Sequence, residues 1–500
     1  DCNLFTGNPF MSNEKPQPSL GLSLAPIVFL ITLLISNVWV FDDEASSGAN
    51  QLALLLGTIF VIFIGTFHLK VPYKNIENSM LDSISRAMNA VLILMVVGAL
   101  ISVWIMCGVV PTMIYYGLGV LTPVIFLPAA CLLCVIVSMT TGSSWSTSGT
   151  IGVALMGIGL TLDLPPGMVA GAVISGAYFG DKMSPLSDTT NLAPAVTGTD
   201  LFEHIRHMVY TSGPALILSL FGFTFLGLFY QNQKPLDPVE ITTVKAAIDQ
   251  YFNVGLSQFL IPAVVSFAIL RKMSALPALS LGVILGLLGT LVFQRDLLVY
   301  LLGNDYKLSE IYKLFLQTAY GGFKISTGNS LLDDLFSRGG MVSMLGTIWL
   351  TMVAMAFAGS MEACGMIDRL AKGMVTQVSR AGHLVGTTIA SCIFFNITTC
   401  EQYLSIVIPG RMFKNSYIRS GLHPKNLSRV VEDSGTVTCV LVPWSSSGAY
   451  HSLVLGVPTL TYLPYCLFNI FSPLVSLFLA TTGWTIVEYQ KNKQPKEDSD

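Results

Sequence analysis

The sequence predicts an all-α polytopic membrane protein, and three observations support this fold class. Of the 500 residues, 52% are hydrophobic and 11% are charged, whereas soluble domains carry about 25% charged residues. The mean hydropathy is +0.66. The apolar residues form runs long enough for a helix to cross a bilayer, which takes about 20 residues, so we expect about 11 to 14 membrane segments. Two inverted repeats with broken helices are predicted, with re-entrant hairpins as one option, and no soluble domain.

The apolar runs follow one another in two series. The first series comprises residues 19–41, 50–69, 88–110, 119–140, 141–160 and 166–198. The second comprises residues 207–230, 256–271, 275–293, 341–361, 382–411, 425–448 and 460–482. The run at 382–411 is long enough for a hairpin. The mixed stretches at 231–255 and 294–340 are expected to be amphipathic or surface connectors.

These runs divide the chain into parts. They are a tail at 1–18, two leading helices at 19–69, a first repeat at 88–230, connectors with two helices at 231–340, a second repeat at 341–482 and a tail at 483–500. Residues 1–10 precede Met11 and are a candidate non-native extension.

Charge and cysteine content exclude several function classes. The net charge of −3 is spread out, and without a basic block we expect no nucleic-acid partner. The nine cysteines are an odd number and lie mostly inside apolar runs, so a disulfide framework is not expected. We expect no cleavable signal, because the first long apolar run starts near Leu20 and lacks a small-residue cleavage site ahead of the next span.

Two pairs of polar breaks indicate the repeats. TGSSWSTSG from Thr141 and NITTCEQYL from Asn396 each lead into a second break, GDKMSPLSDTTNLAP at 180–194 or VEDSGTVTCVLVPWSSSG at 431–448. Aligning the first pair sets Ser143, Ser144 and Ser146 against Thr398, Thr399 and Glu401, and brings Asp181 close to Asp433. Paired interrupted segments are typical of transporter repeats, although chance resemblance of two apolar stretches is the alternative.

Charge placement predicts that the repeats are inverted. The connector TLDLPPG at 161–167 has no Lys or Arg, whereas its partner at 411–429 carries five. Positive loops stay in the cytoplasm, so the two connectors lie on opposite sides. The same rule places the loop 69–87 and both termini in the cytoplasm, including the tail with Lys491, Lys493 and Lys496.

The polar breaks have the chemistry of a cation site. A broken helix at membrane depth exposes carbonyl oxygens, which can bind a small hard cation together with hydroxyls such as those of Ser184, Thr189 and Ser434. A carboxylate at that depth costs about 2.5 to 3.5 kcal/mol on insertion scales. Five are present, and cation binding is one reason to keep them: Asp181, Asp188, Glu401, Glu432 and Asp433. Desolvation raises a carboxyl pKa and a bound cation lowers it, so a proton and a metal ion compete, which at an alternating-access site is antiport.

Three stretches resemble the NhaC-type Na+/H+ antiporters of the ion transporter superfamily. They are GDKMSPLSDTTNLAPA at 180–195, GSSWSTSGTIGVALMGIG at 142–159 and EDSGTVTCVLVPWSSSGA at 432–449, within a resemblance that spans about residues 20 to 482. The resemblance implies an inner-membrane antiporter with the superfamily's inverted-repeat fold that exports Na+ in exchange for H+. By matching position, it assigns to the transport site Asp181, Ser184, Asp188, Thr189 and Asn191. The family also contains an exchanger of malate and protons against sodium and lactate, and these stretches do not separate the two activities.

The candidate ion-binding residues come from both halves. They are Ser143, Ser144, Ser146, Asp181, Ser184, Asp188, Thr189, Asn191, Asn396, Thr398, Thr399, Glu401, Asp433 and Ser434, with Asp181, Asp188, Glu401 and Asp433 as candidate Na+ ligands. Na+ and H+ are the expected transported ions, and no cofactor is expected. Membrane lipid and small inorganic cations are the expected partners, and a homodimer is a candidate assembly.

Other readings stay open. Asp181 could pair with Lys182 at a helix end, and Asp188 could cap a half-helix that starts near Thr189. In a carboxylate exchanger, Lys182 and the serines of 143–148 and 445–447 would bind the anion. An intramembrane hydrolase is a remote alternative, because STSG at 146–149 and SSSG at 445–448 lack the leading glycine of a nucleophile motif.

Overall fold

The computed structural model describes residues 18–41, 48–120, 123–233, 238–271, 273–327, 333, 336–374 and 381–489. The predictions for the first 17 residues and for Lys491, Lys493 and Lys496 lie outside these ranges. The regular structure in the described part is helical, apart from one isolated bridge between Leu422 and Glu488. The predicted all-α class is therefore confirmed.

The first half of the chain forms helices close to the predicted runs. Short π-helical and 3-10 turns carry the symbol η. The elements are α1 Leu20–Phe41, α2 Ala49–Phe63, η2 Ile64–His68, α3 Tyr73–Met106, α4 Val109–Val120, α5 Pro123–Thr141, α6 Ser144–Thr147, η3 Ser148–Gly152, α7 Val153–Thr161, α8 Pro166–Met183, α9 Asp188–Thr197 and α10 Leu201–Gln233.

The connectors and the second half continue the series. They are α11 Pro238–Tyr251, η4 Leu256–Phe259, α12 Leu260–Leu270, α13 Ala275–Phe293, α14 Arg295–Leu302, α15 Leu308–Gly321, η5 Met341–Met344, α17 Leu345–Ala363, α18 Met366–Met374, α19 Ala381–Thr399, α20 Gln402–Arg419, α21 Pro424–Val431, η6 Glu432–Thr436, η7 Cys439–Leu441, α22 Ser446–Leu455, α23 Thr459–Tyr462, η8 Leu463–Tyr465 and α24 Leu467–Thr482.

The described residues contain eight helices long and apolar enough to cross a membrane, or up to ten if each of two bent pairs counts as one span. This number is below the predicted 11 to 14. The difference lies in the interrupted segments, because α6 to α7 is broken by a π turn and α20 carries Arg411, Lys414 and Arg419. Interrupted or charged segments of this kind are not counted among long apolar helices, even where they lie within the bilayer.

Element bounds recur at a spacing of 258 residues. Pro123–Thr141 of α5 corresponds to Ala381–Thr399 of α19, and Asp188–Thr197 of α9 corresponds to Ser446–Leu455 of α22. The intervening helices follow the same spacing, since Pro166 starts α8 and Pro424 starts α21.

Backbone details recur at the same spacing. The break before α6 has Gly142 at φ 66°, and the break before α20 has Cys400 at φ 60°. Ser187 and Ser445 are the N-caps of α9 and α22, and each side chain accepts a hydrogen bond from the backbone N–H three residues later. At this spacing, Ser143 corresponds to Glu401 and Asp181 corresponds to Cys439. The alignment of the polar runs in the sequence instead set Ser146 against Glu401 and Asp181 close to Asp433.

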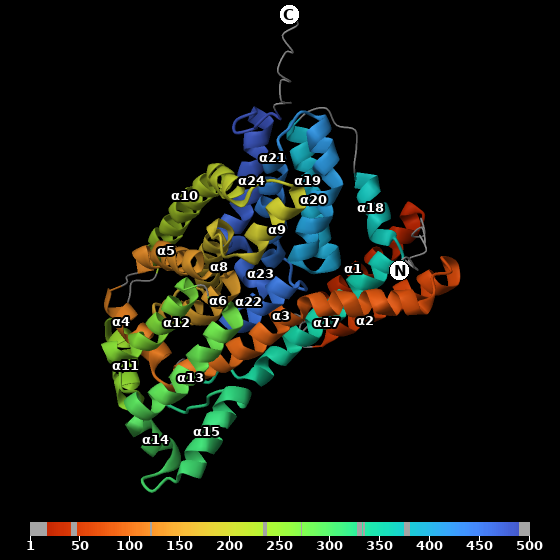
Figure 1. The fold of residues 1–500 in the computed structure, drawn as a ribbon. Helices are drawn as coiled ribbons and strands as arrows, with labels where there is room; N and C mark the ends of the chain where they lie inside the picture. Colours follow the sequence, from red (N-terminus) through yellow and green to blue (C-terminus); the bar gives the residue numbers. More distant parts are fainter. Residues whose placement is uncertain are drawn as a thin grey trace, which may run out of the picture.

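The short helices α9 and α22 each pack on the other half of the molecule. In Figure 1, α9 lies beside α20 near the end that carries the C-terminus, and α22 lies beneath it, toward α17. Helix α9 contacts α20 and α21 of the second half, whereas α22 contacts η3 and α7 of the first half. A scaffold of α3 packed along α17 supports this centre from one side. Four backbone breaks adjoin these helices, at Gly142, at 184–187, at Cys400 and at 442–445, and they are buried or half-buried apart from Pro185 and Leu186.

Candidate functional site

A cavity of about 1470 Å³ reaches the interior breaks of both halves. Half of the predicted site residues line it, namely Ser143, Ser144, Ser146, Asp181, Asp188, Thr189 and Glu401. The others do not line it: Ser184, Asn191, Asn396, Thr398, Thr399, Asp433 and Ser434. The structure thus places the carboxylates Asp181, Asp188 and Glu401 on the wall of one cavity, and Asp433 does not line it.

Asp181 lies in the last turn of α8 at the wall of the cavity, and it is 7% exposed. Its Oδ2 accepts hydrogen bonds from Ser144 Oγ at 2.8 Å and from Ser144 N at 3.1 Å. Ser144 can point there because the chain turns at Gly142, where a Cβ would lie 2.7 Å from Leu186 Cβ. The first turn of α6 therefore presents an N–H and a hydroxyl to the carboxylate, an arrangement that favours negative charge.

The break between α8 and α9 is held by its own polar side chains. Thr190 Oγ1 donates to the carbonyls of Asp181 and Lys182, at 3.3 and 3.0 Å. Asn191 Nδ2 donates to Pro185 O and Ser187 O, and Ser184 Oγ accepts from Leu186 N. Asn191 and Ser184 thus shape the turn.

Asp188 faces the cavity with an exposed side chain. The N-cap of α9 is Ser187. The reading in which Asp188 caps this half-helix is therefore wrong.

Glu401 occupies the matching break in the second half, between α19 and α20. It is 6% exposed, and its Oε2 accepts a hydrogen bond from Ser446 Oγ at 2.8 Å. The neighbouring hydroxyls of Thr398 and Thr399 bond back to carbonyls of their own helix, at 2.9 and 2.7 Å. Asn396 Nδ2 donates to Gly435 O at 2.7 Å and so satisfies a carbonyl in the π turn η6. Of the four, only Glu401 is placed to meet an ion in the cavity.

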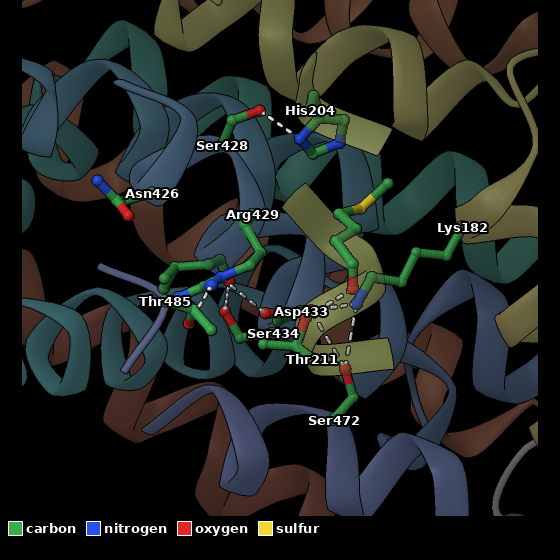
Figure 2. Close-up of polar contacts among 12 residues, drawn as sticks. Lys182, His204, Thr211, Asn426, Ser428, Arg429, Asp433, Ser434, Ser472 and Thr485 are labelled. Carbon is green, nitrogen blue, oxygen red and sulfur yellow. Dashed lines mark hydrogen bonds and ion pairs between the residues drawn. The ribbon is translucent and has the colours of Figure 1, made fainter. Parts of the chain in front are cut away.

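Asp433 lies in a separate buried cluster, shown in Figure 2. Its Oδ1 accepts from Lys182 Nζ, from Thr211 Oγ1 at 3.0 Å and from Ser472 Oγ at 3.4 Å, while Arg429 Nε lies 3.8 Å from Oδ2. Lys182 and Arg429 already neutralise this carboxylate, so the geometry does not support Asp433 as a Na+ ligand. Ser434 Oγ donates to Val430 O and plays no part in the cavity.

The cluster also decides between two readings of Lys182. Its ammonium group is fully buried against Asp433, so it does not pair with Asp181. It does not line the cavity either, and an anion there would instead meet Arg86, Lys372 and Arg411.

Sequence reasoning missed two contacts at the wall of the cavity, one within the second half and one between the halves. One is the Ser446 hydroxyl on Glu401. The other is Tyr450, whose OH donates to Trp145 O at 2.6 Å and whose ring stacks on Trp145 with centroids 4.5 Å apart. The SSSG run that contains Ser446 was a usable signal, but nothing in the sequence distinguishes Tyr450 from a packing residue.

The polar side chains at the cavity near Asp181 carry oxygen atoms, from the carboxylate of Asp188 and from the hydroxyls of Ser144, Ser187 and Thr189. Among the described residues, no three His, Cys, Asp or Glu side chains lie close enough to hold a metal ion together. A cation at Asp181 would find carboxylate and hydroxyl oxygens around it, which is oxygen chemistry for a small hard ion.

Comparisons with known proteins agree with this chemistry. Residues 176–484 match the sequence profile of the Na+/H+ antiporter family. The Na(+)/H(+) antiporter NhaC of Alkalihalophilus pseudofirmus is 36% identical over 94% of this chain and 97% of that protein. The malate-2H(+)/Na(+)-lactate antiporter of Bacillus subtilis is 36% identical over 90% and 92%. The arginine/ornithine antiporter ArcD of Halobacterium salinarum is 32% identical over 98% and 97%.

Proposed function

The chain belongs to the Na+/H+ antiporter family, and from that premise we propose that it is a secondary transporter, not an enzyme, which exchanges Na+ for H+ by alternating access. One observation carries the proposal. Asp181 is a buried carboxylate at the wall of a large cavity, held by Ser144 and built on the broken end of a helix.

In the proposed mechanism Asp181 carries either ion, but not both at once. A proton neutralises the carboxylate in its apolar surroundings, and Na+ does the same with help from nearby hydroxyl and carbonyl oxygens. An empty, ionised carboxylate is the costly state inside the protein. If only the loaded states change their exposure, each Na+ moved one way is replaced by protons moved the other way.

We also propose that the cavity opens to the cytoplasm in an inner membrane, with both termini on that side. Arg86 and Arg411 line the cavity, and they belong to the segments 69–87 and 411–429 that the positive-inside rule places in the cytoplasm. The loop between α14 and α15 then lies outside, at the end of the molecule where these two helices are labelled in Figure 1.

Proteoliposomes with a trapped pH dye test the exchange. An inward Na+ gradient is expected to drive protons out of vesicles that contain the protein, and comparison of Na+, Li+ and K+ gives the selectivity. A folded, reconstituted protein that leaves the internal pH unchanged under every cation gradient would overturn the proposal.

A second candidate is exchange of carboxylates coupled to Na+ and H+. The cavity of about 1470 Å³ exceeds the few hundred to about 1000 Å³ of ordinary small-molecule sites, and Arg411 with Arg86 could bind an anion. The malate/lactate relative is as similar to this chain as the NhaC relative. Flux of labelled malate and lactate in the same vesicles separates the two candidates.

A further inference from the structure

Two side-chain pairs occupy equivalent positions in the two halves, with hydroxyl and carboxylate exchanged. At the spacing of 258 residues, Ser143 corresponds to Glu401 and Asp188 corresponds to Ser446. The first half thus has a hydroxyl at its first break and a carboxylate at its second, and the second half has the reverse.

The two pairs differ in the present conformer. Ser446 Oγ donates to Glu401 Oε2 at 2.8 Å, and both side chains are buried. Asp188 is exposed to the cavity, and no hydrogen bond joins it to Ser143 in the described structure. Ser143 Oγ accepts from Ser146 N at 3.1 Å, which leaves the hydroxyl hydrogen to donate. One pair is therefore made and its equivalent is open.

The surroundings of the pairs are equivalent as well. Asp188 begins α9, which packs on α20, and Ser446 begins α22, which packs on η3. The segment 144–161 that contains η3 is the counterpart of α20 at the same spacing. Each short helix thus docks on the equivalent part of the opposite half.

We propose that the Ser143–Asp188 pair closes when the Glu401–Ser446 pair opens, so that each pair seals one side of the carrier in turn. In transporters built from inverted repeats, one repeat moves against the other around a fixed site. Exchanging one hydroxyl–carboxylate bond, of about 1.5 to 3 kcal/mol, for an equivalent one leaves both states close in free energy. A carrier that turns over needs such a balance.

The proposal separates the roles of the three cavity carboxylates. Asp188 and Glu401 are positioning residues of the two gates. Asp181 has no acidic counterpart, because Cys439 stands at the equivalent position. This inference rests on the alternating access of the proposed function, but it does not depend on which substrate is carried.

Disulfide trapping tests the exclusion directly. Ser143→Cys with Asp188→Cys and Glu401→Cys with Ser446→Cys are combined in one reconstituted protein and oxidised with copper phenanthroline. Peptide mapping identifies the disulfides, so the native cysteines, buried where the structure describes them, can stay. Each molecule is expected to carry one engineered disulfide or the other. Molecules with both disulfides, or a 401–446 disulfide with no 143–188 disulfide under any ion gradient, would overturn the proposal.

A pair of Ser143→Cys with Asn191→Cys is the control, because Asn191 faces the turn at Pro185 and is expected to form no disulfide with position 143.

A swap within the first pair gives a second readout. Ser143→Asp with Asp188→Ser copies the arrangement of the second half and is expected to exchange ions at least tenfold faster than either single variant. The control swap, Ser146→Asp with Asp188→Ser, moves the carboxylate to a non-equivalent cavity position and is expected to give no rescue. A double variant no faster than the singles would count against the pair. If each molecule carries only one of the two disulfides but the protein moves no Na+, the proposed Na+/H+ exchange is wrong and the proposed gates stand. If the protein exchanges Na+ for H+ but single molecules carry both disulfides, the proposed gates are wrong and the exchange stands.

Discussion

Asp181 combines deep burial with two hydrogen bonds from Ser144, and we expect its charge to be indispensable. Asp181→Asn keeps the size of the side chain but removes both the charge and the titration. The variant should insert and fold, and its Na+-driven proton movement in proteoliposomes should fall to the rate of empty vesicles. The amide can neither bind a proton reversibly nor neutralise Na+.

The matched control for this variant is Asp82→Asn on the exposed face of α3, which should leave exchange unchanged. Normal coupled exchange in a well-folded Asp181→Asn protein would return Asp181 to a structural role.

Competition for Asp181 also predicts how the apparent Na+ affinity depends on pH. A proton on the carboxylate excludes Na+, so the affinity should weaken as the pH falls. Below the pKa of the empty site, the apparent KM for Na+ should rise about tenfold per pH unit for one competing proton, and more steeply for coupled carboxylates. Initial rates of Na+ uptake at fixed membrane potential measure this slope. A KM that stays constant across the active pH range would rule out a shared carboxylate.

Residue chemistry alone predicted part of the site. Asp181, Asp188 and Glu401 stand out because charge is costly at membrane depth, and all three line the cavity. The same argument selected Asp433, but it cannot show that Lys182 and Arg429 come from other turns to neutralise that carboxylate. The contacts of a buried charge depend on packing, which a single sequence does not specify.

At the scale of helices, the Lys182–Asp433 pair joins α8 to η6, with Thr211 of α10 and Ser472 of α24 as further partners. Without Lys182, the buried carboxylate of Asp433 keeps only one described cation, Arg429, whose Nε lies 3.8 Å from Oδ2 and makes no hydrogen bond to it. Lys182→Met should therefore lower the free energy of unfolding by about 3 to 5 kcal/mol. Thermal unfolding in detergent, followed by intrinsic fluorescence, measures the loss.

Two variants show that burial is the cause. Lys182→Met combined with Asp433→Leu and Arg429→Met removes all three buried charges and should recover most of the lost stability. Lys74→Met breaks the exposed pair with Glu77 on α3 and should cost less than about 1 kcal/mol. Equal losses for Lys74→Met and Lys182→Met would contradict this account.

His423 precedes α21 in the connection from α20, and its Nδ1 accepts a hydrogen bond from Lys425 N at 3.2 Å. Partial burial lowers the pKa of His423, and the charge of Lys425 adds to the effect. The folded protein therefore favours the neutral ring. Its contribution to stability is present above the unfolded pKa of about 6.5 and is lost as the pH falls through the folded pKa.

His423→Ala should therefore lower the free energy of unfolding at pH 8 by about 1 kcal/mol, the typical value of an N-cap. The difference from wild type should shrink toward pH 5. His423→Ser, which restores a capping oxygen, should be as stable as wild type at pH 8 and less sensitive to pH. A pH-independent loss in His423→Ala would show that the ring acts by packing alone.

Helix positions were more predictable than their pairing between the halves. The apolar run 275–293 coincides with α13, and the run 382–411 splits into α19 and α20. The sequence alignment matched polar residues that make different contacts in the two halves. It therefore differs by three to six residues from the spacing of 258 at which the helix bounds recur. The positive φ of Gly142 and Cys400 recurs at the spacing of 258 residues, and a cysteine gives no sequence signal for that backbone state.

For the whole molecule, orientation in the membrane follows from the placement of Lys and Arg. The cationic residues around Lys70 and Lys74 before α3 should lie on the same side as those of the 411–429 segment, whereas the loop between α14 and α15 should lie on the opposite side. The long span α3 links the two sides, since it starts beside the first cluster and ends near α4 and α13.

Labelling of single cysteines in intact and permeabilised cells tests this orientation. Asn75→Cys and Asn415→Cys lie at exposed positions next to the two cationic clusters, and a membrane-impermeant maleimide should reach them only after permeabilisation. Asn304→Cys in the α14 to α15 loop should react in intact cells. The eight cysteines in the described residues are buried, so background labelling should be low. In the inverted arrangement, the connector 411–429 lies on the side opposite to its counterpart 161–167 and on the same side as the segment 69–87. Asn415 and Asn75 should therefore be labelled from the same face of the membrane. Labelling of the two positions from opposite faces would therefore break the inverted-repeat architecture, and with it the exchange of gates between the halves.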